Sequence, residues 1–311
     1  MENFIELGKT IYNLNNPREA RRFAVFLARC CLHPQRITNL KKFFSQSECL
    51  TAISKKFPFF YEQITRAFFF YKSNYPVRKK IIEDSMIFFT QTLDENFLLE
   101  LYGGEEFELW QTPIDETRGD LKLFLSVLPG QRKEGLISTV LRISDGSPIY
   151  QINFWIAQDN LLDLKNSTGD LAMWIGAMQG SNVEDSRELI KLLTKKCHAY
   201  RTKNLILYAT QAVARALGLK KIFAVTNYGY YANNHVRLDR KLKTSFGDFW
   251  AECGGVLTSD KRFFELPLVE PRKSYEEIPV RKRAVYKRRF ELLDGLDAAV
   301  EEKILSFKKA T

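Results

Sequence analysis

Two basic residues stand at the start of a segment that is patterned like a helix. Arg201 and Lys203 flank Thr202, and apolar side chains then recur at helical spacing up to Gly218. This pattern predicts a helix with Thr202 as its N-cap and Gly218 at its C-terminal end. Because a helix N-terminus is partially positive, exposed cations there cost about half a kcal/mol each unless an anion binds beside them. Arg201, Thr202 and Lys203 are therefore a candidate phosphate or carboxylate site, and two solvated cations are the alternative.

A second candidate is the pair Gln179 and Gly180, which ends the apolar segment 171–178. This segment predicts a buried strand. In open α/β sheets, ligands bind at the carboxyl ends of strands, and a glycine there lets a ligand approach backbone amides closely. We interpret Gln179 and Gly180 as part of a cofactor-binding site, and an ordinary turn is the alternative.

A third group follows the predicted strand at residues 221–226, in a segment rich in tyrosine and asparagine. Asn227 is placed either to hydrogen-bond a ligand or to tie the turn, and Tyr228, Tyr230 and Tyr231 come next. A tyrosine acts as a general acid near neutral pH only if its pKa is shifted strongly, and the alternative is that these side chains pack. His198 is either a packed or capping histidine or a catalyst. Asn227, Tyr228 and His198 are the predicted catalytic residues.

The fourth candidate is a basic stretch near the C-terminus, where six of the nine residues at 281–289 are Lys or Arg. The stretch reads as one face of a helix. Clusters of this kind either are solvated or bind anionic lipid or nucleic acid. The candidate anion or membrane patch comprises Lys282, Arg283, Lys287, Arg288 and Arg289. No zinc finger, RNP motif or helix-turn-helix signature is present, which argues against nucleic acid.

The composition indicates a globular protein with an acidic partner. The chain has 311 residues, of which 45% are hydrophobic, and 47 Lys and Arg against 37 Asp and Glu give a net charge of +10. Five cysteines without a CxxC pair favour a reducing compartment, and three histidines argue against a metal site. The motifs of P-loop NTPases, Rossmann dehydrogenases, α/β-hydrolases and zincins are absent.

The chain carries no recognisable signal peptide and no apolar run long enough to cross a membrane. We therefore expect a cytoplasmic protein that contacts the inner membrane peripherally at most.

The elements that must position these residues divide the chain into three predicted regions. Residues 1–101 carry helical patterns at 17–30, 50–56, 61–71 and 77–90 and are dense in phenylalanine. This predicts either a small helical core or an apolar groove for an acyl chain or a membrane surface. Residues 102–270 form a mixed α+β region, and residues 271–311 form a basic helical tail.

In the middle region, apolar residues first recur at every second position. Strands are predicted at residues 107–110, 121–128, 136–143, 149–156 and 171–178, with a hairpin turn at Asp145-Gly146. A helical stretch at 185–217 then leads to a strand at 221–226, which is typical of a parallel βαβ unit. A further helix and a strand at 262–268 complete a mixed, mostly antiparallel sheet.

Several segments together resemble the VirK/YbjX family of Gram-negative bacteria. They are residues 146–150 (GSPIY), 175–180 (IGAMQG), 198–204 (HAYRTKN), 224–227 (AVTN) and 282–290 (KRAVYKRRF). At 198–203 the family usually has His-Gly-Leu-Arg-Pro-Lys, so this chain lacks the glycine and the proline and keeps the cations. The resemblance implies a protein that acts in envelope maintenance, virulence or tolerance of antimicrobial peptides.

The order of the elements is similar to that of Gcn5-related acyltransferases. In that superfamily the strand before the long helix separates from its neighbour, and the pyrophosphate of a thioester cofactor lies at the helix N-terminus. The resemblance implies an acyl donor near Gln179, Gly180, Arg201 and Lys203, and an acceptor amine or hydroxyl near Asn227. The usual phosphate loop of the superfamily is absent, so acyl carrier protein is an alternative donor to acyl-CoA, and its acidity suits a basic chain.

Two functions follow from this reading. The first is acyl transfer from a phosphopantetheine thioester. The second is non-enzymatic binding of anionic lipid headgroups or lipopolysaccharide precursors through residues 281–289 and the aromatic N-terminal region.

Overall fold

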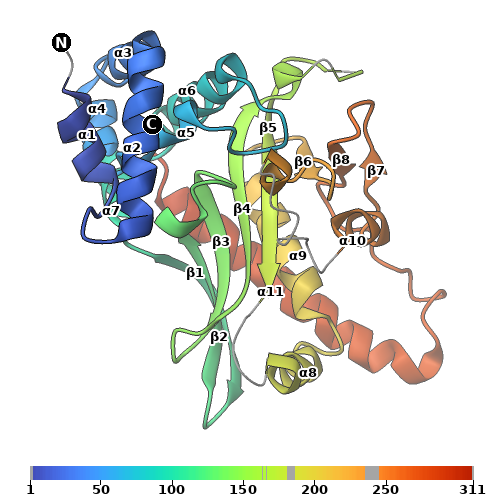
Figure 1. Ribbon diagram of the computed structural model, residues 1–311. Helices are drawn as coiled ribbons and strands as arrows, with labels where there is room; N and C mark the ends of the chain where they lie inside the picture. Colours follow the sequence, from blue (N-terminus) through green and yellow to red (C-terminus); the bar gives the residue numbers. More distant parts are fainter. Residues whose placement is uncertain (1–2, 163, 166, 181–185, 235–244, 310–311) are drawn as a thin grey trace.

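The computed structural model describes residues 3–162, 164–165, 167–180, 186–234 and 245–309 (Figure 1). Within these residues, helices pack around and beside one mixed sheet of eight strands in the order β1-β2-β3-β4-β5-β6-β8-β7. Neighbouring strands are antiparallel except β5 and β6, which are parallel. This confirms the predicted α+β class with a helical N-terminal region, a mostly antiparallel sheet and a C-terminal helix.

The strands alternate buried and exposed positions where one face meets solvent, and they become almost wholly buried in the centre of the sheet. Their bounds are β1 Phe107–Asp115, β2 Gly119–Ser126, β3 Ile137–Ile143, β4 Pro148–Gln158, β5 Leu171–Gly180, β6 Ile222–Val225, β7 Val256–Leu257 and β8 Phe263–Leu266. The predicted hairpin at Asp145-Gly146 is confirmed, because Gly146 has φ +85° between β3 and β4.

The N-terminal region is a cluster of helices with a phenylalanine-rich core. Its helices are α1 Phe4–Ile11, α2 Pro17–Leu32, α3 Pro34–Phe44, α4 Glu48–Lys56, α5 Phe59–Thr65, α6 Tyr75–Thr92 and α7 Glu95–Gly103. Phe44, Phe60 and Phe89 are at most 2% exposed, so these rings pack a core rather than line an open groove. Helix α5 ends at Thr65, six residues before the predicted end of its helical pattern.

Helix α6 joins the N-terminal region to the sheet at the edge of β4. The side chain of Asp84 accepts from the backbone amide of Gln158, and the Ser85 hydroxyl bonds both backbone groups of Ile156. Strand β3 pairs with β4 only as far as Phe154. The helix therefore satisfies backbone groups that a strand has left unpaired.

The remaining helices are α8 Ser186–Lys196, α9 Thr202–Ala216, α10 Phe246–Glu252 and α11 Arg283–Ser306. Helices α9 and α11 lie side by side behind the sheet (Figure 1). The predicted helical stretch at 185–217 is thus two helices in the described residues, and its first residue, Asp185, lies outside them.

The second half of α11 belongs to the main core. Leu293, Leu296, Val300 and Ile304 are at most 1% exposed, and the ring of Phe307 stacks on Phe97 of α7 with centroids 4.2 Å apart. The end of the chain therefore packs against the N-terminal helices. The division into three regions at 101 and 270 stays a prediction.

Candidate functional site

The parallel strands β5 and β6 separate part of the way along their length. They pair only from Met173 to Ile175 on β5, and no described strand lies on that side of β5 from Gly176 to Gly180. Strand β5 also carries one extra residue against β4, because Asn153 faces Ala177 whereas Phe154 faces Ile175. This bulge at Gly176 marks the point where the strands separate. Bulges of this kind often lie next to active sites.

A segment between β2 and β3 crosses the sheet directly over this bulge. We call residues 129–136 the strap; it includes the short 3-10 helix η1 Pro129–Gln131. A Cβ atom on Gly176 would lie far inside contact distance of the Glu134 carbonyl oxygen and 2.6 Å from Trp155 Cζ3. A Cβ atom on Gly135 would lie 2.6 Å from the backbone nitrogen of Phe154. Two glycines therefore allow the strap to approach the sheet at backbone distance.

The N-terminal helices hold the strap in place. Glu62 of α5 is fully buried and accepts from Arg132 Nε at 2.6 Å. The side-chain amide of Gln63 donates to the carbonyl oxygens of Arg132 at 2.7 Å and Gly135 at 3.3 Å. The backbone of Lys133 accepts from another N-terminal residue, the amide of Phe69. Helix α5 and the segment that follows it therefore hold the strap against the sheet.

The strap places one carboxylate, that of Glu134, in the core beneath the bulge. Glu134 is 3% exposed. Its carboxylate accepts from the Tyr230 hydroxyl at 2.5 Å, Gln179 Nε2 at 2.7 Å and Asn153 Nδ2 at 2.9 Å. Burial raises the pKa of Glu134, and the three donors oppose that rise. A buried carboxyl with a perturbed pKa beside a strand end is typical of functional sites.

Replacing Glu134 with glutamine should cost about 1–3 kcal/mol of stability, because an amide cannot accept from three donors. The folded-state pKa lies above the unfolded value of 4.5, so the carboxyl contributes less stability as the pH rises from about 4 through its folded pKa. The advantage of the native chain over Glu134→Gln should therefore shrink with rising pH. Urea unfolding between pH 4 and 8 measures this.

The exposed residue Glu105 offers a control for this comparison. Glu105→Gln should track the native chain at every pH. A gap between the native chain and Glu134→Gln that grows with rising pH would contradict the burial of the carboxyl.

Three glutamines join Glu134 to a surface cavity. Gln179 Nε2 donates to Glu134 and to Gln131 Oε1 at 3.0 Å, while Gln179 Oε1 accepts from Gln131 at 3.3 Å and from Gln151 at 3.4 Å. The cavity has a volume of about 380 Å³ and is lined by Gln131, Pro148, Ile149, Tyr150, Gln151, Gln179 and Gly180. The predicted pair at the end of β5 thus lies in this cavity wall.

The predicted N-cap of α9 is wrong. Arg201 is the N-cap residue, and no side chain of the described residues caps this helix end. Thr202 is 1% exposed and its hydroxyl has no hydrogen-bond partner among the described residues. Because its side chain points into the core, it cannot reach the free backbone amides. Gly218 has φ +79° at the other end of the helix, as predicted.

The two cations beside Thr202 both contact α10. Arg201 pairs with Glu252 at 2.8 Å, with both side chains more than half exposed, and Lys203 Nζ lies 3.8 Å from the ring centre of Phe249. The positive charge of Arg201 also acts on Tyr150, since it partly offsets the rise that burial causes in the pKa of this phenol. Arg201 thus makes an exposed ion pair, whereas Lys203 lies against an aromatic ring. Their role in anion binding stays a prediction.

The predicted catalytic residue His198 sits in a strained turn before α9. His198 has φ +54° and Ala199 has φ +59°, both in the left-handed region. The guanidinium of Arg289 donates to the carbonyl oxygens of His198 and Ala199 at 3.1–3.2 Å. Arg289, one of the predicted patch residues, therefore fixes this turn from α11.

Replacing Ala199 with glycine should stabilise the protein by about 0.5–1 kcal/mol. A left-handed backbone costs alanine about 1–2 kcal/mol. Glycine removes this strain but also raises the conformational entropy of the unfolded chain, which offsets part of the gain. The matched variant Ala284→Gly, on an exposed position of α11, should lose about 0.5–1 kcal/mol instead. Equilibrium unfolding in urea measures both. Equal losses in the two variants would contradict the left-handed turn.

The side chains of the third predicted group, which follows β6, point to different parts of the molecule. Asn227 Oδ1 accepts from the backbone amide of Phe246 at 2.6 Å, so this side chain ties the start of α10. Tyr228 is 54% exposed and its ring lies edge-on against Tyr71. Tyr230 instead reaches Glu134. His235, the last residue of this segment, lies outside the described residues. The predicted roles of Asn227, Tyr228 and His198 in catalysis remain untested.

The basic patch is exposed over most of its length. Lys282, Lys287 and Arg288 are exposed, and Lys287 makes an ion pair with Glu291 at 4.0 Å. Arg283 is half-buried, donates to the carbonyl of Ile278 at 3.2 Å and lies over the ring of Tyr275. This part of α11 projects beyond the sheet (Figure 1).

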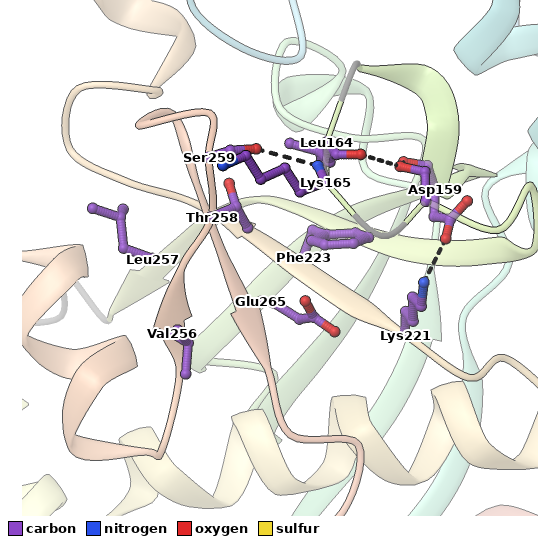
Figure 2. A pocket seen from close by; sticks show the side chains of 11 residues that line it. Asp159, Leu164, Lys165, Lys221, Phe223, Val256, Leu257, Thr258, Ser259 and Glu265 are labelled. Carbon is purple, nitrogen blue, oxygen red and sulfur yellow. Dashed lines mark hydrogen bonds and ion pairs between the residues drawn. The ribbon is translucent and has the colours of Figure 1, made fainter.

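A second cavity, of about 330 Å³, lies between β6, β7 and the turn before β5 (Figure 2). The fully buried carboxylate of Asp159 accepts there from Lys221 Nζ at 2.6 Å and from the backbone amide of Gly169 at 2.7 Å. Val256 and Leu257 form the opposite wall. None of the residues singled out in the sequence lines this cavity.

No pattern in the sequence predicted the strap. Glu134, Gln131 and Asn153 lie in a loop and within a strand, without a spacing that marks them as a group. The usable signal was the pair of glycines, Gly135 and Gly176, which lie where side chains would otherwise be expected. An isolated glycine inside a strand pattern predicts a bulge or a close backbone approach.

The fold and site define an α+β protein with a separated parallel strand pair and a buried acid beneath it. The chain belongs to the DUF535 family, proteins of unknown function, whose family model matches residues 15–302. This confirms the resemblance to the VirK/YbjX family.

The chain is similar to several curated proteins. It is 31% identical to the uncharacterised protein YbjX of Escherichia coli K12, over 64% of this chain and 61% of that protein. It is 28% identical to an uncharacterised protein of Haemophilus influenzae, over 67% of this chain and 66% of that protein. The matches thus span less than two thirds of either relative. It is also 25% identical to the membrane protein LapB of Mannheimia haemolytica, over 63% of this chain and 79% of that protein. No solved structure matches the chain significantly.

Proposed function

We propose that this protein is an acyltransferase that uses a phosphopantetheine thioester as its donor. The observation that carries the proposal is the separation of β5 from β6 after Ile175, with a bulge at Gly176 and the carboxylate of Glu134 beneath it. The strand order, with one parallel pair linked through α8 and α9, is similar to the layout of Gcn5-related acyltransferases.

The free edge of β5 suits the arm of such a donor. Between Gly176 and Gly180, one side of β5 has no strand partner among the described residues, so alternate backbone N–H and C=O groups face the opening. An extended chain that contains amides can add to such an edge as a further strand would. The pantetheine arm has two amides in an extended chain.

Arg201 suits the phosphate end of the donor. Its exposed ion pair with Glu252 contributes at most about 1 kcal/mol, so a phosphate can replace the carboxylate. Its guanidinium would then lie at the N-terminus of α9, which itself attracts anions. The net charge of +10 further favours an acidic carrier such as acyl carrier protein.

The reaction balances without a redox partner. The nitrogen or oxygen of an acceptor attacks the thioester carbonyl carbon, the C–S bond breaks, and the proton lost by the acceptor ends on the thiol that leaves. Glu134 is too buried to touch the reacting atoms. Its role in the proposal is to position Gln179 at the end of β5, where the thioester would lie.

Calorimetric titration of the full chain with decanoyl-CoA and with decanoyl acyl carrier protein tests the proposal. We expect binding of at least one donor, weakened about tenfold or more in Arg201→Ala, since a hydrogen bond to a charged group contributes about 1.5–3 kcal/mol. The control is Lys220→Ala, which removes an exposed cation at the other end of α9. Absence of binding to both donors at millimolar concentration would overturn the proposal.

A second candidate function is peripheral binding to an anionic membrane, which would place the protein in the cytoplasm at the inner membrane. Val280 is 77% exposed and Tyr275 is 51% exposed. Val280 lies two residues before the exposed Lys282, and the guanidinium of Arg283 lies over the Tyr275 ring. Exposed apolar side chains among cations are typical of interfacial anchors. Among the described helices, none combines the length and the apolar character that a membrane span requires. The name of the LapB relative agrees with membrane contact.

Flotation with vesicles containing phosphatidylglycerol tests this candidate. The double variant Lys287→Ala and Arg288→Ala should weaken binding about thirtyfold, at about 1 kcal/mol for each cation. Arg289 is left unchanged because it holds the turn at His198. Lys55→Ala with Lys56→Ala, on exposed positions of α4, is the control. Equal binding of both double variants would exclude the patch as the anchor.

A further inference from the structure

The cavity at the end of β5 has walls that fit one chemical class of ligand. Its volume is about 380 Å³, which is within the range of small-molecule sites. Gln131, Gln151 and Gln179 supply amides, and Pro148 and Tyr150 supply apolar surface, whereas Ile149 is fully buried. None of the described residues that line this cavity carries a formal charge.

The buried acid fixes which way these amides point. The carboxylate of Glu134 accepts from three donors, so the amide nitrogen of Gln179 must face it. The oxygen of Gln179 then faces the amide nitrogens of Gln131 and Gln151, at 3.3 Å and 3.4 Å. The orientation of all three side chains is therefore set by one buried carboxyl group outside the cavity.

This orientation leaves matched donors and acceptors for a ligand. Gln179 uses both N–H groups and accepts two bonds within the protein. Gln131 and Gln151 each keep one N–H group and at least one oxygen lone pair without a partner among the described residues. A hydroxyl group both donates and accepts, so neighbouring hydroxyls match such a pair of amides. A charged ligand would find no counter-charge in this wall.

We propose that this cavity binds a neutral, hydroxyl-rich ring compound, such as a sugar, and that this compound is the acyl acceptor. The assignment of the acceptor role rests on the proposed acyltransferase function, and the assignment of the ligand class rests on the cavity alone. The apolar face of a sugar ring would pack on Pro148 and Tyr150. Its hydroxyls would bond Gln131 and Gln151, which places one of them next to Gly180 and the free edge of β5.

Saturation-transfer NMR with methyl glucoside and N-acetylglucosamine as probes tests this inference on the full chain. We expect contact signals from at least one sugar. Citrate, which the exposed cations elsewhere on the chain attract, should not displace the sugar, because none of the described residues that line this cavity is charged. Gln151→Leu should reduce sugar binding about tenfold or more, because a buried polar partner is lost. Gln91→Leu, on an exposed position of α6, should leave binding unchanged.

The two proposals fail in different ways. Donor binding without any sugar signal would overturn the assignment of the cavity and leave the acyltransferase proposal intact. Sugar binding that Gln151→Leu does not weaken would likewise overturn it, because the ligand would lie elsewhere. Sugar binding that Gln151→Leu removes, in a protein that binds neither donor, would support the cavity and contradict acyl transfer.

Discussion

Replacing Gly176 with alanine should destabilise the protein by about 3 kcal/mol or more. The new methyl group would meet the Glu134 carbonyl oxygen on the strap and the Trp155 ring on β4. Both neighbours are fully enclosed, so neither can move without disturbing the core, and overpacking of this kind typically costs about 1–3 kcal/mol or more. Urea unfolding at constant pH measures the loss.

Two further glycine variants show whether the strap is the cause. Gly135→Ala should cost a similar amount, because its methyl group would meet the backbone of Phe154 from the opposite side. Gly295→Ala lies on an exposed turn of α11 with open space around it and should instead stabilise the helix by about 0.5–1 kcal/mol. If Gly176→Ala and Gly295→Ala had equal stability, the strap would not cross β5 where the structure places it.

Replacing Glu62 with alanine should cost about 3–5 kcal/mol, the usual loss when one partner of a buried ion pair is removed. Glu62 is fully buried and accepts from Arg132 at 2.6 Å and from Arg66 at 3.1 Å. Without it, both guanidinium groups would lose their partner, and the strap would lose its firmest attachment to α5. The exposed pair of Lys9 and Glu6 gives the control, since Glu6→Ala should cost less than about 1 kcal/mol.

The two buried acids should respond to pH in opposite directions. Burial alone would raise the pKa of Glu62, but Arg132 and Arg66 outweigh it and hold that pKa below its usual value. Its stabilising effect is therefore present above the unfolded pKa of 4.5 and is lost as the pH falls through the folded pKa. Unfolding experiments between pH 3 and 7 should show the native chain losing more stability in acid than Glu62→Ala. An equal loss would contradict a charged Glu62.

The elements that carry a strong hydrophobic period were predictable from sequence. Strands β2 to β5 lie within two residues of their predicted bounds, because alternation fixes which face is buried. Strand β7, Val256–Leu257, was missed because two exposed residues carry no period. The start of α9 was predicted to within one residue, but the turn at His198 that separates it from α8 was not. This turn has no glycine or proline and depends on Arg289, which is distant in sequence.

The candidate site was harder to predict, because its chemistry depends on contacts between distant segments. Arg201 and Lys203 read as an unmatched pair of cations at a helix start, but α10 supplies Glu252 and Phe249 to them. In the sequence, Glu134 is one acidic residue in a polar loop. Its position under Gly176 depends on the path that the strap takes across the sheet. A charge pattern shows which charged residues a segment has, but it does not show which partners another segment places next to them.

The most direct test of the proposed donor site is hydrogen exchange of the backbone amides of β5. With a decanoyl thioether analogue of CoA bound to the full chain, the amides between Gly176 and Gly180 that face β6 should exchange at least about tenfold more slowly, as new backbone hydrogen bonds form. Amides of β2, which has strands on both sides, should not change. If the analogue binds and the β5 amides exchange as fast as before, the separated strands do not hold the donor.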